Sequence, residues 1–73
     1  MKISIKYCGE WNYHPRAASL AEEINLKFKD VTVDLIEGSG GVFDISKNGE
    51  NIFSRTREGR FPEVDEILEK LQE

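Results

Sequence analysis

The chain has 73 residues, 38% of them hydrophobic, with a formal net charge of −4, so we expect a single monomeric domain spanning residues 1–73. The acidic balance disfavours a nucleic-acid partner, and no apolar run approaches the roughly 20 residues that a membrane span needs. One Cys and one His are too few for a usual metal site, and a lone Cys excludes an intramolecular disulfide, which indicates a reducing, cytoplasmic location.

The first half of the chain predicts a strand, a helix and a second strand. Residues 2–7 alternate polar and apolar side chains, the period of a half-buried strand. Pro15 suits the first helical position, whereas the preceding His14 is expected to lie outside the helix. Apolar residues then recur at helical spacing as far as Lys29-Asp30 (Ala17, Leu20, Ala21, Ile24, Phe28). A second alternating segment over residues 31–35 completes a strand–helix–strand unit, which predicts two parallel strands and a right-handed crossover.

The second half predicts a hairpin and a closing helix. Short strands over residues 42–46 and 52–54 flank Asn48-Gly49, the strongest short hairpin signal. Residues 54–61 are expected to form a polar loop, and Pro62 to open a second helix. The expected fold class is α/β, in the order β-α-β-β-β-α: a two-layer sandwich of the thioredoxin-like kind with a four-stranded mixed sheet. Because the first two strands alternate cleanly, both helices should cover one face and leave the other wet.

The only Cys, His and Trp of the chain lie in one segment, residues 7–18, where the first strand gives way to the helix. Cys8 is the candidate nucleophile, and Lys6, His14 and Arg16 are near enough in sequence to favour its thiolate. The alternative is that Cys8 is a small buried hydrophobe, which is a common role for an unpaired Cys. Its place in a glycine-containing turn beyond the strand predicts an exposed side chain.

Two further groups of side chains are candidates for binding. Trp11, Tyr13 and Phe61 predict an apolar patch beside Cys8, of a kind enriched in protein interfaces. The polar loop carries three arginines within six residues, which could hold a carboxylate or a phosphate (Arg55, Arg57, Arg60). The alternative for these arginines is a solvated surface with nearby glutamates as counter-charges (Glu58, Glu63).

The segment Tyr7-Cys8-x-x-Trp11 followed by Pro15-Arg16-Ala17-Ala18 resembles the redox motif of the selenoprotein W-like (Rdx) family. Members of that family carry Tyr-Cys-x-x-Cys or Tyr-Cys-x-x-selenocysteine there. The resemblance continues through residues 40–45, Asn48-Gly49, residues 52–55 and residues 59–63, so it covers essentially the whole chain.

This resemblance implies a thioredoxin-like fold and a small cytosolic thiol or selenol redox protein with Cys8 as the attacking sulfur. It implies glutathione or thiol-bearing proteins as partners, with glutathione as a co-substrate and no resident cofactor. The side chains then expected to bind glutathione or a partner lie in the turn and in the arginine-rich loop (Tyr13, His14, Arg16, Arg55, Arg57, Arg60).

The sequence departs from the family at Trp11, which stands where the family has its second Cys or selenocysteine. Trp cannot close a Cys-x-x-Cys disulfide, so the enzymatic activity open to this chain is monothiol oxidoreductase chemistry or peroxide reduction. Two interpretations stay open: a natural monothiol protein, or a Trp in place of a selenocysteine, whose UGA codon is one base from the Trp codon. A redox-silent interaction module that uses the Cys8–Trp11 turn and the Arg55–Arg60 loop is the alternative function.

Overall fold

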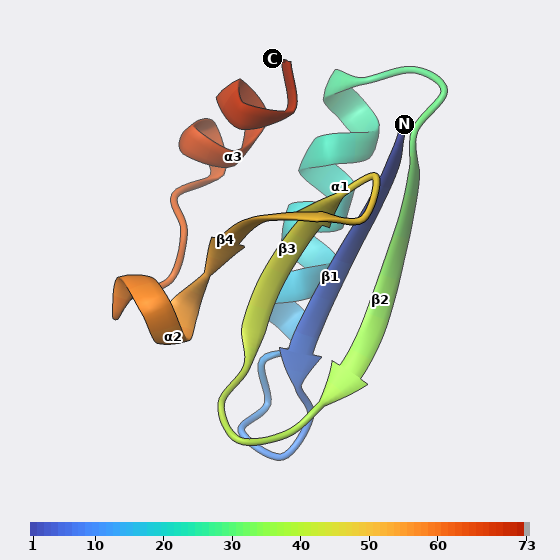
Figure 1. Ribbon diagram of the computed structural model, residues 1–73. Helices are drawn as coiled ribbons and strands as arrows, with labels where there is room; N and C mark the ends of the chain where they lie inside the picture. Colours follow the sequence, from blue (N-terminus) through green and yellow to red (C-terminus); the bar gives the residue numbers. More distant parts are fainter. Residues whose placement is uncertain (73) are drawn as a thin grey trace.

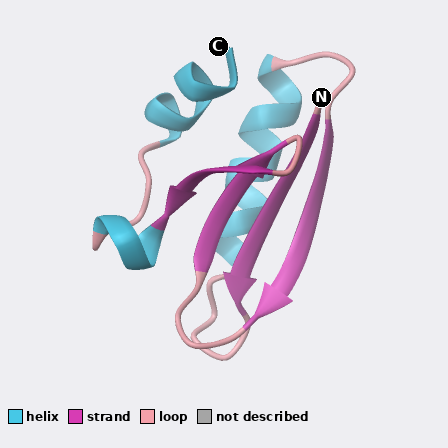
Figure 2. Ribbon diagram, viewed as in Figure 1, coloured by secondary structure: helices cyan, strands magenta, loops and turns pink. Residues whose placement is uncertain are grey.

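The computed structural model describes residues 1–72, which form a mixed four-stranded sheet and three helices (Figures 1 and 2). The strands are β1 (Lys2–Cys8), β2 (Thr32–Gly38), β3 (Phe43–Lys47) and β4 (Glu50–Ser54). The helices are α1 (His14–Lys27), α2 (Arg55–Glu58) and α3 (Val64–Gln72). The strand order is β2-β1-β3-β4, so β1 is a central strand that runs parallel to β2 and antiparallel to β3. Within residues 1–72, no helix has the length and apolar character to cross a membrane.

The predicted parallel pair is confirmed, with α1 as the connection between β1 and β2. The prediction that His14 precedes the helix is wrong, because α1 begins at His14. The carbonyl oxygen of Tyr13 accepts hydrogen bonds from the N–H groups of both Arg16 and Ala17, at 3.1 Å each, and this closes the first turn one residue early. At the other end, Phe28 is extended with φ −115° and ψ 143°, so α1 ends at Lys27, before the predicted Lys29-Asp30.

The predicted hairpin between β3 and β4 is also confirmed. Lys47 pairs with Glu50, which leaves Asn48 and Gly49 as a two-residue loop with φ of 50° and 87°. Positive φ at both positions is the type I′ turn, whose twist matches that of the flanking strands. The Asn48 side chain also accepts a hydrogen bond of 2.9 Å from the Lys2 N–H, which ties the hairpin to β1.

The segment predicted as a polar loop contains the four-residue helix α2. Gly59 ends this helix in the left-handed region at φ 74°, a conformation that glycine adopts without steric cost. The following helix, α3, begins at Val64 and not at Pro62. Its start is defined by Glu66, whose Oε1 accepts a 2.8 Å hydrogen bond from the Glu63 N–H in the manner of a capping box.

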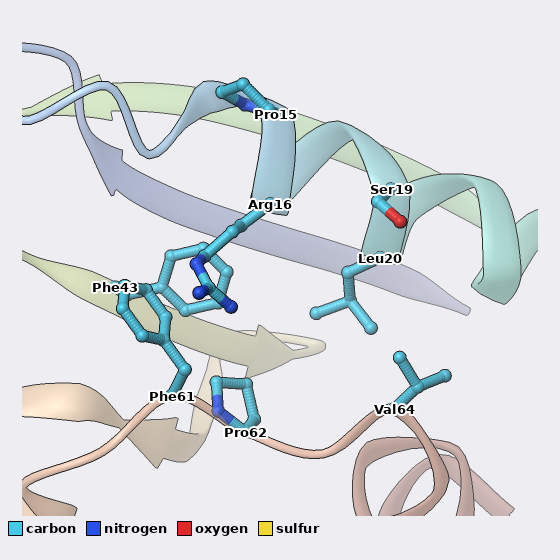
Figure 3. Close-up of a pocket in the computed structure, with 8 residues that line it drawn as sticks. All are labelled: Pro15, Arg16, Ser19, Leu20, Phe43, Phe61, Pro62 and Val64. Atoms are coloured by element: carbon cyan, nitrogen blue, oxygen red, sulfur yellow. The ribbon is translucent and has the colours of Figure 1, made fainter.

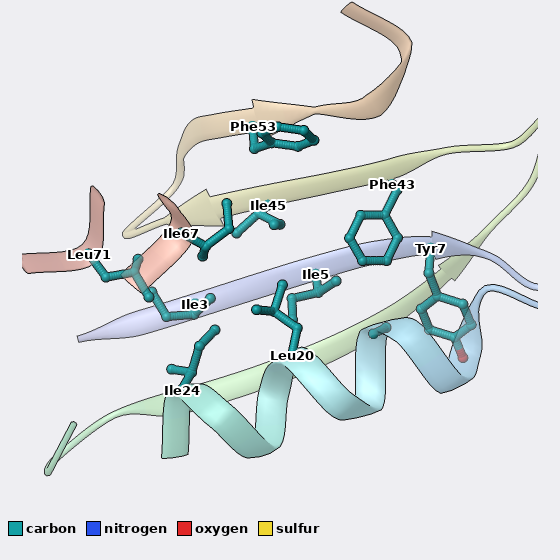
Figure 4. Packing of buried hydrophobic residues seen from close by; sticks show 11 residues of the cluster. Ile3, Ile5, Tyr7, Leu20, Ile24, Phe43, Ile45, Phe53, Ile67 and Leu71 are labelled. Carbon is teal, nitrogen blue, oxygen red and sulfur yellow. The ribbon is translucent and has the colours of Figure 1, made fainter. Parts of the chain in front are cut away.

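The core lies between one face of the sheet and helices α1 and α3 (Figure 4). Ile3, Ile5 and Tyr7 of β1 are buried, whereas the alternate residues Lys2 and Lys6 are exposed and Ser4 is half-buried. The remaining core members come from β3, β4 and the two helices (Phe43, Ile45, Phe53, Ala17, Leu20, Ile24, Ile67, Leu71). The predicted arrangement, with both long helices on one face, is therefore confirmed.

The Arg60–Glu66 ion pair gives α3 a pH-dependent contribution to stability. Arg60 Nη1 lies 2.6 Å from Glu66 Oε1. The hydrogen bonds that the Glu66 carboxylate accepts from the Arg60 guanidinium and from the Glu63 N–H lower its pKa from 4.5 to about 2. Because the folded-state pKa is depressed, this stabilisation is complete above pH 4.5 and is lost as the pH falls through about 2.

We therefore expect Glu66→Gln to reduce the free energy of unfolding at pH 7 by about 1 kcal/mol, a value discounted for solvent screening. The difference from the wild type should vanish as the pH approaches about 2. Urea denaturation across this pH range measures the effect, and Glu69→Gln on the same helix is the control. An equal loss in both variants would contradict the assignment of the effect to the Arg60–Glu66 pair.

Candidate functional site

Cys8 is the last residue of β1, and its side chain is completely buried. The predicted exposure of Cys8 is therefore wrong. The strand continues one residue further than expected, so that Cys8 pairs with Gly38 and its N–H donates a 2.8 Å hydrogen bond to the Val42 carbonyl oxygen. Its own carbonyl oxygen accepts a 3.1 Å hydrogen bond from the Tyr13 N–H, so both the following turn and the distant Gly38–Val42 segment hold its backbone.

The Cys8 side chain belongs to the face of the sheet opposite the helices. Side chains alternate along a strand, and the neighbouring Tyr7 belongs to the core, whereas Cys8 does not. A Cβ atom on the opposite residue, Gly38, would lie 2.9 Å from Lys6 Cε and 3.0 Å from Val42 Cγ1. The side chains of Lys6 and Val42 thus pack against the sheet directly beside Cys8.

The turn over residues 9–13 closes the end of the sheet next to Cys8. Gly9 donates its N–H to the Gly38 carbonyl oxygen at 3.1 Å, and Asn12 adopts a positive φ of 59° within the turn. Trp11 is 57% exposed, yet its ring lies against the buried Gly41 of the β2–β3 connection. The turn is therefore held by backbone hydrogen bonds and by one aromatic contact.

The contact between Trp11 and Gly41 predicts that a side chain at position 41 costs more stability than one at position 40. Gly41 has φ 78°, and an added Cβ would lie 2.5 Å from Trp11 Cζ3, whereas neighbouring Gly40 has φ 72° with open space around it. We expect Gly40→Ala to cost about 1 kcal/mol of backbone strain and Gly41→Ala about 2–3 kcal/mol, because only the second also displaces the ring. In a Trp11→Ala background the two costs should become equal, as measured by thermal or urea unfolding. An unchanged difference there would show that the Trp11 ring does not rest on Gly41.

Tyr13 connects the turn to the C-terminal half of the chain. Its ring makes edge-to-face contacts with Trp11, Phe61 and Phe43, at centroid distances of 6.0, 4.8 and 6.4 Å. The predicted association of Trp11, Tyr13 and Phe61 is thus confirmed, whereas its predicted place beside Cys8 stays a prediction. The ring of His14 packs edge-on against Tyr7 at 5.3 Å, a contact with the core side of β1 and not with the face that carries Cys8.

The three loop arginines do not form one clamp. Arg60 pairs with Glu66, and not with the expected Glu63, whereas Arg57 contacts Glu58 at 3.3 Å and also donates to Asn51. Arg55 instead lies over the rings of Tyr13 and Phe61, at 5.5 and 5.0 Å from their centroids.

Arg16, from the first turn of α1, joins Arg55 at the same ring. Its guanidinium carbon lies 4.0 Å from the Phe61 centroid, close enough for a cation–π contact. The structure therefore brings Arg16 and Arg55 together with Tyr13 and Phe61, and it assigns Arg57 and Arg60 to acidic partners of their own.

A pocket of about 270 Å³ lies beside this cluster, between α1 and the segment that leads into α3 (Figure 3). Its lining is mostly apolar, with one guanidinium and one hydroxyl group (Pro15, Arg16, Ser19, Leu20, Phe43, Phe61, Pro62, Val64). This pocket was not predicted from the sequence. The available signal was the pair of prolines near the helix starts, each next to a side chain that lines the pocket.

The described residues 1–72 contain no group of three or more His, Cys, Asp or Glu side chains placed to hold a metal ion. The arrangement offers one sulfur at the end of a central strand, an aromatic turn beside it and a cationic, partly apolar surface around Phe61. These groups can support nucleophilic sulfur chemistry and the binding of an anionic partner.

Two curated proteins match nearly the whole length of this chain. The chain is 24% identical over 72 residues to migration and invasion enhancer 1 of Bos taurus, covering 99% of this chain and 63% of that protein. The match to the Mus musculus protein of the same name is also 24%, over 70 residues, with 96% and 61% covered. The chain thus spans less than two thirds of the length of these curated relatives.

Solved structures match more closely. A crystal structure from Bordetella parapertussis superposes with a TM-score of 0.93 at 36% identity, covering 97% of this chain and 92% of that one. A selenoprotein W-related protein from Vibrio cholerae gives a TM-score of 0.84 at 30% identity, covering 97% and 91%. The fold is thioredoxin-like. Because the sequence model of the Rdx family also matches residues 2–73, the chain belongs to the Rdx family.

Proposed function

We propose that this protein is a monothiol redox protein in which Cys8 is the attacking sulfur. The observation that carries the proposal is the position of Cys8 at the end of the central strand β1, directly before the turn to α1, in a chain of the Rdx family. We infer that this sulfur reaches solvent when the turn moves, because Cys8 stands outside the core cluster between the sheet and the helices. Such chemistry needs a reducing compartment, so the proposal includes a cytoplasmic location.

The proposed reaction is thiol–disulfide exchange with glutathione as co-substrate. The Cys8 thiolate attacks a disulfide between glutathione and a partner protein, a Cys8–glutathione disulfide forms, and the partner leaves as its thiolate. A second glutathione thiolate then attacks the glutathione sulfur of that mixed disulfide. The Cys8 thiolate is regenerated, and oxidised glutathione carries away the pair of sulfurs. Trp11 has no sulfur, so the mixed disulfide can be resolved only by an external thiol.

Access to Cys8 requires the turn over residues 9–13 to open. Cys8 has no exposed surface in the closed arrangement, and the turn is held by the Gly9–Gly38 hydrogen bond and by the contact of Trp11 with Gly41. Local opening of a short turn costs less free energy than global unfolding, so a buried thiol at such a position reacts through a minor open state. Partner binding at Trp11 would favour that state.

The proposed glutathione-binding residues are Tyr13, His14, Arg16 and Arg55. They surround the turn, and the two arginines have no carboxylate partner within residues 1–72. Arg57 and Arg60 are less suited to this role, since each guanidinium already contacts a glutamate.

A coupled assay tests the proposal. Reduction of a glutathione mixed disulfide is followed through glutathione reductase and NADPH, with wild-type protein and with Cys8→Ser. We expect turnover in the wild type and none above the uncatalysed rate in Cys8→Ser, with linear dependence on glutathione concentration. Equal rates in the two proteins would contradict a redox role for Cys8. Peroxide as the oxidant in the same assay measures the alternative route through a sulfenic acid.

Trp11 as the native residue is supported by its packing. The ring is accommodated by Gly41, where a Cβ would collide, and by Tyr13 at 6.0 Å. The other interpretation, selenocysteine at position 11 of the natural protein, has a direct test: elemental mass spectrometry of the protein from its natural source. Absence of selenium supports the monothiol proposal, whereas one selenium atom per chain would replace it by selenol chemistry.

The second candidate function is a protein-interaction module in which Cys8 takes no part. The complete burial of Cys8 together with the 57% exposure of Trp11 favours this candidate. It predicts that Cys8→Ser retains partner binding while Trp11→Ala weakens it. Exposed Trp side chains are frequent hot spots, so the expected loss on truncation is about 10-fold or more in affinity.

A further inference from the structure

Arg16 and Arg55 form a cation pair around the ring of Phe61 that lacks any acidic partner. Their guanidinium carbons lie 4.0 and 5.0 Å from the Phe61 centroid, and neither guanidinium group has an ion pair or a hydrogen bond within residues 1–72. Both remain unpaired although the chain has 14 acidic and 10 basic residues. By contrast, Arg57 and Arg60, two and five residues beyond Arg55, have glutamate partners.

Arg55 shows a second sign of an unfilled site. Its Nε atom is buried and has no hydrogen-bond partner within residues 1–72. A buried donor without an acceptor carries a desolvation cost, and that cost is removed when an acceptor arrives. The rings of Tyr13 and Phe61 hold the guanidinium in place, so little side-chain entropy is lost when an anion binds.

Helix α1 adds to the same positive potential. Its first turn has no acidic residue and no side-chain cap, and Arg16 itself lies there. The amino end of a 14-residue helix carries a partial positive charge, which an acidic side chain in the first turn would stabilise. Here the positive end, Arg16 and Arg55 all remain without a counter-charge within residues 1–72.

The apolar pocket lies directly beside these cations, because Arg16 and Phe61 belong to its lining (Figure 3). Its volume of about 270 Å³ is below the usual range of roughly 300–1,000 Å³ for sites that enclose a drug-sized ligand. A pocket of this size suits one large apolar side chain as an anchor, the usual arrangement at the centre of a protein interface. Glutathione has no such side chain to place in it.

We propose that the Arg16–Arg55 pair and the adjoining pocket form a docking site for an acidic segment of a partner protein. The segment places one aromatic or aliphatic side chain in the pocket between Leu20 and Val64, and an adjacent carboxylate on the two guanidinium groups. The match of charge is what selects this partner: the two guanidinium groups have no carboxylate within residues 1–72, so they attract a carboxylate and repel a basic segment, although the chain as a whole has a net charge of −4. This site goes beyond the redox proposal, since its function requires no reaction at Cys8.

The test uses the full chain under reducing conditions with a capped peptide that contains one phenylalanine followed by two glutamates. Binding is followed by two-dimensional NMR, and we expect shifts concentrated at the amides of Ser19, Leu20 and Val64. Replacement of the phenylalanine by alanine, or of both glutamates by glutamine, should each weaken binding about 5-fold or more. A higher salt concentration should lower the affinity of the acidic peptide and leave the affinity of the glutamine peptide unchanged.

Protein variants provide the matched control. Arg16→Gln and Arg55→Gln should each lower the affinity for the acidic peptide about 5-fold. The Arg57 guanidinium already contacts Glu58, so Arg57→Gln should change this affinity less than about 2-fold. Equal effects of all three variants, equal binding of the glutamine peptide, or shifts elsewhere on the surface would each overturn the proposal. Phenylpropionate binding as tightly as the peptide would also overturn it, in favour of a small-molecule site. Because no thiol reaction is involved, none of these outcomes bears on Cys8 chemistry.

Discussion

Replacement of Trp11 by cysteine is expected to convert this monothiol protein into a dithiol one. The new side chain stands three residues after Cys8, the spacing of a Cys-x-x-Cys site, and at the position where the family resemblance implies a second sulfur. After incubation with oxidised glutathione, Trp11→Cys should contain an internal disulfide, no free thiol and no bound glutathione. The reason is that the second thiolate attacks the Cys8–glutathione disulfide at the Cys8 sulfur and releases glutathione. The wild type should instead retain one glutathione adduct.

The control for this experiment is Glu10→Cys. Glu10 is exposed in the same turn but stands only two residues after Cys8. We expect this variant to accumulate glutathione adducts, with little internal disulfide. Thiol titration and intact-protein mass spectrometry measure both species. Equal behaviour of the two variants would show that the turn does not present position 11 to the Cys8 sulfur.

Alkylation of Cys8 is expected to be slow in the native protein and fast when the turn is loosened. Cys8 has no exposed surface, so iodoacetamide should react about 100-fold more slowly with the folded than with the urea-unfolded chain. Trp11→Ala removes the contact with Gly41 and should raise the native rate about 10-fold, because it increases the population of the open turn.

Leu26→Ala is the matched control for the alkylation experiment. Leu26 is a large apolar residue on α1 that is 76% exposed and belongs neither to the turn nor to the core cluster. Its replacement should leave the rate unchanged. A fast rate in the wild type would mean that Cys8 is accessible without opening of the turn. A slow rate in Trp11→Ala would mean that other contacts, such as those of Lys6 and Val42, control access.

The elements specified by local chemistry were predictable from the sequence. Alternation in residues 2–7 and the sequence Asn48-Gly49 each depend on short-range rules, and both gave the observed strand and turn. The fold class follows from them, since a parallel strand–helix–strand unit and one hairpin leave few arrangements. The aromatic association around Tyr13 was also predicted, because its members lie next to the two helix starts.

The features that depend on tertiary contacts were not predictable in the same way. The inclusion of Cys8 in β1 depends on pairing with Gly38 and on the hydrogen bond to Val42, and both partners are about 30 residues away. The distribution of the arginines depended on α2, a four-residue helix too short to leave a periodic signal. With α2 in place, the Arg55 guanidinium lies over the Tyr13 ring and Arg60 pairs with Glu66.

Intact-protein mass spectrometry of the wild type after incubation with oxidised glutathione tests the central claim most directly. If Cys8 is the attacking sulfur behind a turn that opens, each chain should gain one glutathione. Peptide mapping should place it on Cys8, and excess reduced glutathione should remove it. A chain that stays unmodified at Cys8, even with Trp11→Ala, would contradict the account and favour a role in protein binding alone.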